Sequence, residues 1–209
     1  MPHVVLLGDS IFDNAAYVSG GPDVAAQLRA TLPAGWQATN AAVDGAVVAD
    51  VERQLSRIPA DATHLALSVG GNDALRHLDI LDRSARSTAE VLDLLARIGS
   101  GFAGQYRAML RKVLGRGLPT TVCTIYEGAL PDPALDRRAR VALHVFNDPI
   151  VRAALEERAP LIDLRLICGE AGDYANPIEP SVQGGAKIAR AVAASVGAVE
   201  PRRESRVLS

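Results

Sequence analysis

Three short motifs carry residue types that suit acyl-transfer chemistry. Ser10, within Gly8-Asp9-Ser10-Ile11, follows a predicted strand, so its hydroxyl faces a crevice where the chain turns. Gly45, within Asp44-Gly45-Ala46, offers an N–H that no side chain obstructs, and Asn72, within Gly70-Gly71-Asn72-Asp73, offers an amide donor. Acyl transfer needs a nucleophile and donors preset around the developing oxyanion. Ser10 is therefore the candidate nucleophile, and the N–H groups of Ser10 and Gly45 with the Asn72 amide form the candidate oxyanion hole.

Taken singly, each motif is more typical of a turn or a helix cap than of catalysis. Ser10 or Asp9 alone would suit a capping position, and Gly-Gly-Asn-Asp alone would suit a turn. All three motifs, however, come directly after predicted strands, and the carboxyl ends of parallel strands form the edge where α/β sheets bind ligands. This shared position favours catalysis, with Asp9 as a supporting residue.

The elements that position these motifs are predicted by short apolar runs that alternate with longer amphipathic stretches. This alternation is typical of parallel strands covered by helices on both faces, so the sequence predicts an α/β fold. Strands are predicted at Val4–Leu7, Gln37–Ala41, His64–Val69, Thr120–Thr124 and Leu161–Ile162. Helices are predicted at Pro22–Leu32, Val48–Arg57, Ser84–Leu114, Arg137–Glu157 and Gly184–Val196, the third divided by Gly99, Gly101 and Gly104. The segment 127–133 predicts a long loop at the ligand-binding edge.

Length and composition narrow the class of protein. The 209 residues predict one domain over residues 1–200, followed by a polar tail over residues 201–209. A formal net charge of −2 gives no electrostatic footprint for nucleic acid or an acidic membrane, so neither partner is expected. Cys123 and Cys168 are predicted to be buried thiols, and the amino terminus lacks the pattern of a signal peptide, so a cytoplasmic protein is expected. The sequence contains no phosphate-binding glycine loop and no zinc-spaced Cys or His pair, so neither a cofactor nor a metal is expected, and the oligomeric state stays open.

The order of the motifs around Ser10, Gly45 and Asn72 resembles the SGNH (GDSL-type) hydrolase superfamily, over roughly Val4 to Val196. The resemblance implies a three-layer α/β/α sandwich, a flavodoxin-like SGNH hydrolase fold with a parallel five-stranded sheet. It also implies a carboxylic ester hydrolase that works without a metal and forms an acyl-serine intermediate on small-molecule esters.

The chain departs from that family in its fourth motif, Asp-x-x-His. Asn176 stands where the aspartate is expected, and Glu179 stands where the histidine is expected. In a Ser-His-Asp triad the histidine takes the serine proton and the aspartate orients the histidine. The departure therefore puts the catalytic base in doubt.

Glu179 has three interpretations at this stage. In the first it is the general base, which requires burial to raise its pKa from the ordinary value of about 4.3 toward neutrality. In the second it forms a salt bridge with a neighbouring residue, for example Arg165, which would lower its pKa and leave a weak enzyme or a binder. In the third the base comes from elsewhere, such as Asp173; His77 is the only histidine that starts near the expected crevice. The first interpretation predicts an esterase for short acyl chains, and the alternative is a catalytically weak or inactive SGNH-like binding module.

Overall fold

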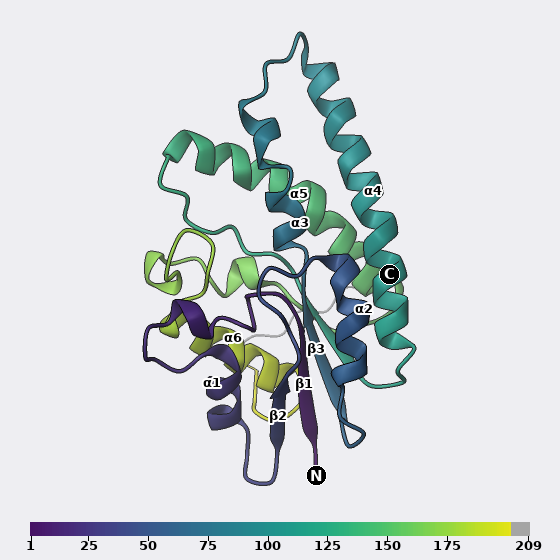
Figure 1. Ribbon diagram of the computed structural model, residues 1–209, viewed down its shortest axis with the longest axis vertical. Coiled ribbons are helices and arrows are strands. Elements are labelled where there is room, and N and C mark those ends of the chain that lie inside the picture. The colour runs from purple at the N-terminus through teal and green to yellow at the C-terminus, as the bar shows by residue number, and fades with distance from the viewer. Residues whose placement is uncertain (202–209) are drawn as a thin grey trace.

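The computed structural model of the protein describes residues 1–201 and is built around a single five-stranded parallel sheet (Figure 1). The order across the sheet is β2-β1-β3-β4-β5. The strands are β1 (His3–Gly8), β2 (Gln37–Asn40), β3 (His64–Ser68), β4 (Thr120–Cys123) and β5 (Leu161–Ile162). The predicted parallel sheet is confirmed. Of the predicted polar tail, residues 202–209 lie outside the described residues.

The central strands are apolar on both faces because helices cover the sheet from both sides. β1 is buried along its whole length, and successive side chains alternate between the faces. Val4 and Leu6 belong to one core cluster, while Val5 and Leu7 belong to the other. A continuous apolar run in the sequence therefore corresponds to a strand covered on both faces.

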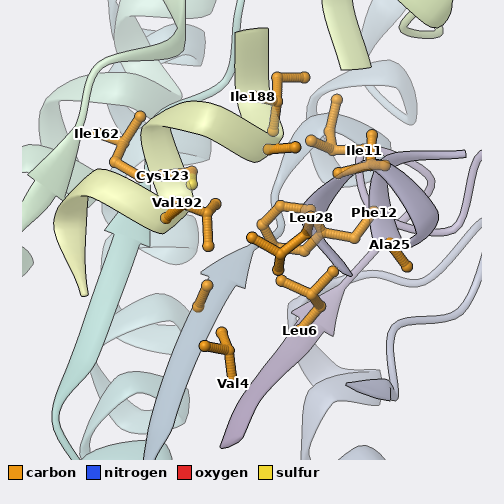
Figure 2. Packing of buried hydrophobic residues seen from close by; sticks show 14 of the residues in the cluster. Val4, Leu6, Ile11, Phe12, Ala25, Leu28, Cys123, Ile162, Ile188 and Val192 are labelled. Carbon is orange, nitrogen blue, oxygen red and sulfur yellow. The ribbon is translucent and has the colours of Figure 1, made fainter. Parts of the chain in front are cut away.

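The first core cluster lies between the sheet and the helices α1 (Val24–Thr31) and α6 (Val182–Ser195). Figure 2 shows Leu28 of α1 close to Leu6 of β1, and Val192 of α6 belongs to the same cluster. The opposite cluster packs the sheet against α2 (Val51–Gln54), α4 (Thr88–Leu114) and α5 (Pro133–Glu156). The result is the expected three-layer α/β/α arrangement.

The starts of the longer helices follow from local capping signals. Asp23 accepts a hydrogen bond from Ala26 N–H at the start of α1, and Ser181 does the same for Gly184 N–H at the start of α6. α5 begins earlier than predicted, because Asp132 caps it and Pro133 occupies its first turn. The predicted helix over Val48–Arg57 is a short α-helix flanked by 3₁₀ turns.

The predicted division of the longest helix by glycine is wrong, since α4 runs unbroken from Thr88 to Leu114. Its carboxyl half buries large side chains such as Phe102, Tyr106 and Leu110 against the sheet and α5. Tertiary packing of this kind outweighs the cost of about 1 kcal/mol for each helical glycine. At Gly99 a Cβ would lie 2.8 Å from Val145 Cγ1, so glycine here permits the close approach of α5.

The cysteines and the helix lengths bear on disulfide bonding and on membrane spanning. Cys123 and Cys168 are buried free thiols, as predicted. Within residues 1–201, none of the helices combines the length and the apolar character needed to span a bilayer.

The carboxyl ends of the central strands lead into the segments that build the candidate site. β3 is followed by the short helix α3 (Gly71–Leu75) and the 3₁₀ helix η4 (Leu78–Asp82). In Figure 1 these elements and the amino-terminal half of α5 stand above the end of the sheet. They form a cap over the edge where the sequence places Ser10 and Asn72.

Candidate active site

Ser10 lies immediately beyond β1, at a point where β1 and β3 are in close contact. Gly8 has a φ of 127°, and a Cβ there would lie 1.7 Å from the Ser68 carbonyl oxygen. Only glycine fits this position, because both the backbone conformation and the space exclude a side chain. This contact brings Ser10 beside the loop that follows β3.

Gln54 fixes the same position from α2. Its side chain accepts a hydrogen bond from Gly8 N–H at 2.7 Å and donates one to Gly8 C=O at 2.7 Å. Gln54 was not among the residues predicted from the sequence to build the site. The available signal was a polar side chain on the apolar face of a predicted helix, because a buried amide requires partners of this kind.

Ser10 and Glu179 form a direct hydrogen bond although 169 positions separate them in the chain. Ser10 Oγ donates to Glu179 Oε1 at 3.0 Å, and the two residues are only 7% and 5% exposed. Burial raises the pKa of Glu179 to about 7, the bond from Ser10 opposes that shift, and the nearby charge of Asp44 adds to it. Glu179 Oε2 has no hydrogen-bond partner within the described residues. The pair has the geometry of a hydroxyl nucleophile and a carboxylate that can take its proton.

A mostly apolar cavity opens beside this pair. Its lining includes Ser10, Asn72 and Glu179, and further lining residues come from η4, α5 and the loop after β4. The apolar wall residues include Leu78, Leu81, Leu130, Ala142, Leu143 and Phe146. No lysine or arginine belongs to the lining, and no group of three metal-ligating side chains occurs in residues 1–201. The sequence did not reveal these walls, because their position depends on how α5 and η4 pack.

The sequence profile described as the GDSL-like lipase/acylhydrolase family matches residues 6–186. The chain belongs to this family. It is accordingly a member of a family of carboxylic ester hydrolases. No curated protein sequence matches the chain.

Solved structures of other hydrolases share the fold. The lipase Lip_vut3 from a goat rumen metagenome superposes with a TM-score of 0.72 at 16% identity, covering 93% of this chain and 97% of that chain. An extracellular lipase from Streptomyces rimosus gives a TM-score of 0.68 at 17% identity, covering 93% and 100%. The acetylxylan esterase Axe2 from Geobacillus stearothermophilus gives 0.63 at 19% identity, covering 93% and 94%. These likenesses confirm the predicted fold class.

The structure of this GDSL-family protein does not bring Arg165 to Glu179. Arg165 Nη2 instead pairs with Asp163 Oδ2 at 2.6 Å, and Asp163 also accepts a bond from Thr124. The interpretation in which an ion pair with Arg165 suppresses the basicity of Glu179 is therefore wrong. The guanidinium group of Arg165 is bound by Asp163, two positions earlier in the chain, and does not extend to the site.

Asp173 is also engaged away from the Ser10 hydroxyl. Its carboxylate pairs with Lys187 at 2.8 Å, and it accepts further bonds from Gln183 and from Glu170 N–H. Burial alone would raise the pKa of Asp173, but Lys187 and these hydrogen bonds hold it below its ordinary value. Asp173 is not part of the cavity lining, so it does not supply the base in this geometry.

Asn176 acts on the backbone of the turn that carries Glu179. Its Oδ1 accepts hydrogen bonds from the N–H groups of Ile178 and Glu179, both at 2.9 Å. The other candidate base, His77, belongs to the cavity wall, where its ring lies 6.1 Å from that of Phe146.

The candidate oxyanion residues are only partly assembled. Asn72 lines the cavity and donates from Nδ2 to the Ala46 carbonyl at 3.0 Å, which ties the loop after β3 to the loop after β2. Gly45 sits in that second loop with a φ of 76°, exposed and outside the cavity lining. The structure thus joins Ser10, Asn72 and Glu179 in one cavity and leaves Gly45 at an adjoining turn.

Asp9 is a second buried carboxyl at the site. It is 3% exposed, lines the cavity, and accepts a hydrogen bond from Ile11 N–H at 3.2 Å. Burial raises its pKa to about 7 despite that bond, and the charges of Glu179 and Asp73 raise it further. Two carboxyl groups with elevated pKa therefore flank Ser10.

Proposed function

We propose that this GDSL-family hydrolase is a serine esterase for short-chain carboxylic esters, in which Glu179 is the general base that activates Ser10. The hydrogen bond of 3.0 Å from Ser10 Oγ to Glu179 Oε1 carries the proposal. It is supported by the burial that raises the pKa of Glu179 to about 7, because a base works best when its pKa is near the working pH.

The proposed reaction has two halves. Ser10 Oγ attacks the ester carbonyl carbon while its proton passes to Glu179 Oε1, and the oxyanion accepts bonds from Ser10 N–H and the Asn72 amide. When the tetrahedral intermediate collapses, the C–O bond to the alcohol breaks and the alcohol leaves with the proton from Glu179. Water then loses a proton to Glu179 and attacks the acyl-serine. The second collapse releases the carboxylic acid and returns the proton to Ser10.

The apolar cavity is proposed to hold the acyl group. Its walls include aliphatic side chains, among them Ala142 and Leu143 of α5 and Leu78 and Leu81 of η4. An apolar pocket of this kind gains free energy from a buried alkyl chain, at about 0.8 kcal/mol per methylene. We expect kcat/KM for p-nitrophenyl esters to rise from acetate to butyrate.

The deciding experiment traps the intermediate. The protein is mixed with p-nitrophenyl butyrate, quenched in acid, and analysed by intact mass and by peptide mapping. We expect one butyryl group on the peptide that contains Ser10, and none in the Ser10→Ala variant. If the wild type turns over esters no faster than Ser10→Ala, the esterase proposal fails and the binding module becomes the better account.

A further inference from the structure

The carboxylate of Glu179 is held by little besides the hydrogen bond from Ser10. Oε1 accepts that bond, and Oε2 has no partner within the described residues. A general base must nevertheless stay within hydrogen-bond reach of the proton it removes. Since its carboxylate has a single hydrogen-bond partner among the described residues, the position of Glu179 also depends on the backbone that carries it.

That backbone is fixed from several parts of the fold. Within the turn, Ala175 N–H donates to the Glu179 carbonyl at 2.9 Å, and Asn176 Oδ1 accepts from Glu179 N–H at 2.9 Å. From β1's side, Asn14 Nδ2 donates to the Pro180 carbonyl at 3.0 Å. From β4's side, Tyr126 Oη donates to the carbonyl of Ile178, the residue before Glu179, at 2.6 Å.

Tyr126 is well suited to fix the turn because it is itself immobilised. It is 5% exposed, and its ring packs edge-on against Tyr174, with ring centroids 5.3 Å apart. Burial also raises the pKa of Tyr126 well above its ordinary value, so the hydroxyl remains a donor at every working pH. The ring belongs to the cavity wall, while the hydroxyl is committed to the Ile178 carbonyl.

We propose that Tyr126 is a positioning residue of the esterase, which holds the Ile178 carbonyl and thereby keeps the Glu179 carboxylate at bonding distance from Ser10. The proposal rests on the function proposed above. In this arrangement the base is oriented through its backbone, by the bond from the Tyr126 hydroxyl, and not by a side chain that bonds to the Glu179 carboxylate.

The experiment compares two tyrosines of one packed pair. Tyr126→Phe removes only the hydroxyl and keeps the ring in the cavity wall. Tyr174→Phe is the matched control, because Tyr174 Oη also donates to a backbone carbonyl at 2.6 Å, that of Cys168, away from Glu179. We expect Tyr126→Phe to lower kcat roughly tenfold with KM nearly unchanged, since small displacements of catalytic groups reduce the rate strongly. Tyr174→Phe is expected to keep kcat within about twofold of wild type.

A double-mutant cycle separates positioning from general damage. If Tyr126 acts through Glu179, adding Tyr126→Phe to Glu179→Gln costs no further rate, because the base is already absent. An additive loss, an equal loss of kcat in Tyr174→Phe, or an unchanged kcat in Tyr126→Phe would overturn the proposal.

Two further arms keep the result interpretable. If Glu179→Gln itself retains full activity, the proposed function fails, whereas loss in Glu179→Gln without loss in Tyr126→Phe defeats only the positioning role. Should Tyr126→Phe melt below the assay temperature, Asn176→Ala tests the same turn, with Asn176→Asp as the rescue that keeps the acceptor oxygen. We expect kcat to fall in Asn176→Ala and to recover in Asn176→Asp; equal rates in the two variants would contradict control of Glu179 through its backbone.

Discussion

Two buried carboxylates, Asp173 and Glu179, lie six positions apart in the same segment and have opposite electrostatic character. Asp173 is fully buried but pairs with Lys187 and accepts bonds from Gln183 and a backbone N–H, and its pKa falls below the ordinary value. Glu179 is 5% exposed, has one bond from Ser10 and no cationic partner within residues 1–201, and its pKa rises to about 7. Burial is common to both, so the partners decide the sign of the shift.

The difference separates a structural carboxylate from one available for chemistry. The negative charge of Asp173 is balanced by Lys187, and this ion pair holds α6 to the preceding segment. Glu179 keeps an oxygen without a partner in the described residues and lies beside an apolar cavity. Such unbalanced burial costs stability and is characteristic of functional sites.

The largest expected effect comes from exchanging the carboxylate for an amide at each position. Glu179→Gln should lower kcat at least about a hundredfold, the scale of a lost general base, while the fold is retained. Asp173→Asn should keep kcat within about threefold, because its carboxylate does not contact Ser10. Steady-state kinetics with p-nitrophenyl butyrate and circular dichroism measure both; similar losses in the two variants would erase the contrast.

The second effect is on stability, where Asp173→Asn, the variant expected to keep its activity, is the one expected to lose stability. Asp173→Asn should lower the free energy of unfolding at pH 7 by about 2 kcal/mol, because it leaves Lys187 without a buried counter-charge. The folded pKa of Asp173 is depressed, so its contribution is present at neutral pH and disappears as pH falls below its ordinary value of 3.8. Urea unfolding at pH 7 and pH 3 tests this. An equal loss at both pH values would show that the ion pair is not responsible.

The third effect is a pH dependence of the rate. Because Glu179 must be deprotonated to accept the Ser10 proton, kcat/KM should rise as pH increases through about 7, by roughly tenfold between pH 6 and pH 8. Asp173→Asn should show the same inflection, which makes it the control. A rate that is flat over this range would indicate that Glu179 titrates at an ordinary value.

The smallest effect concerns Asp9, which resembles Glu179 in having no ion pair with any residue that the structure describes. Its folded pKa of about 7 exceeds its ordinary value of 3.8, so ionisation favours unfolding as pH rises from about 4 through 7. Asp9→Asn keeps an acceptor for Ile11 N–H and removes the charge. It should therefore raise the free energy of unfolding by about 1 kcal/mol at pH 8 and by less at pH 5. Thermal unfolding at the two pH values measures it, and a gain at pH 5 as large as that at pH 8 would contradict the assignment.

The fold was predictable because its determinants are local in the sequence. β1 and β3 contain short apolar runs, and the longer amphipathic stretches between the strands correspond to helices such as α1 and α6. The glycines of α4 were misleading, because Gly99 serves contact with α5 rather than a break in the helix. A glycine that permits close helix packing and one that ends a helix look alike in sequence.

The candidate site was predictable as a set of residues but not as a geometry. The motifs identified Ser10, Asn72 and Glu179, which the structure brings to one cavity. The contacts of Arg165 with Asp163 and of Tyr126 with Ile178 depend on side-chain directions after the chain has folded. Sequence spacing alone contains no information about those directions.

The two outer strands have a consequence for how copies of this chain meet. β5 consists only of Leu161–Ile162, and on the other side of the sheet Arg29 Nη1 donates to the Ala38 carbonyl of β2 at 3.3 Å. A sheet edge becomes a template for aggregation when it offers a long row of unpaired backbone groups to an incoming strand. Here one edge is too short and the other is partly covered by a charged side chain. Pairing between copies of the chain through either edge strand of this sheet is therefore disfavoured.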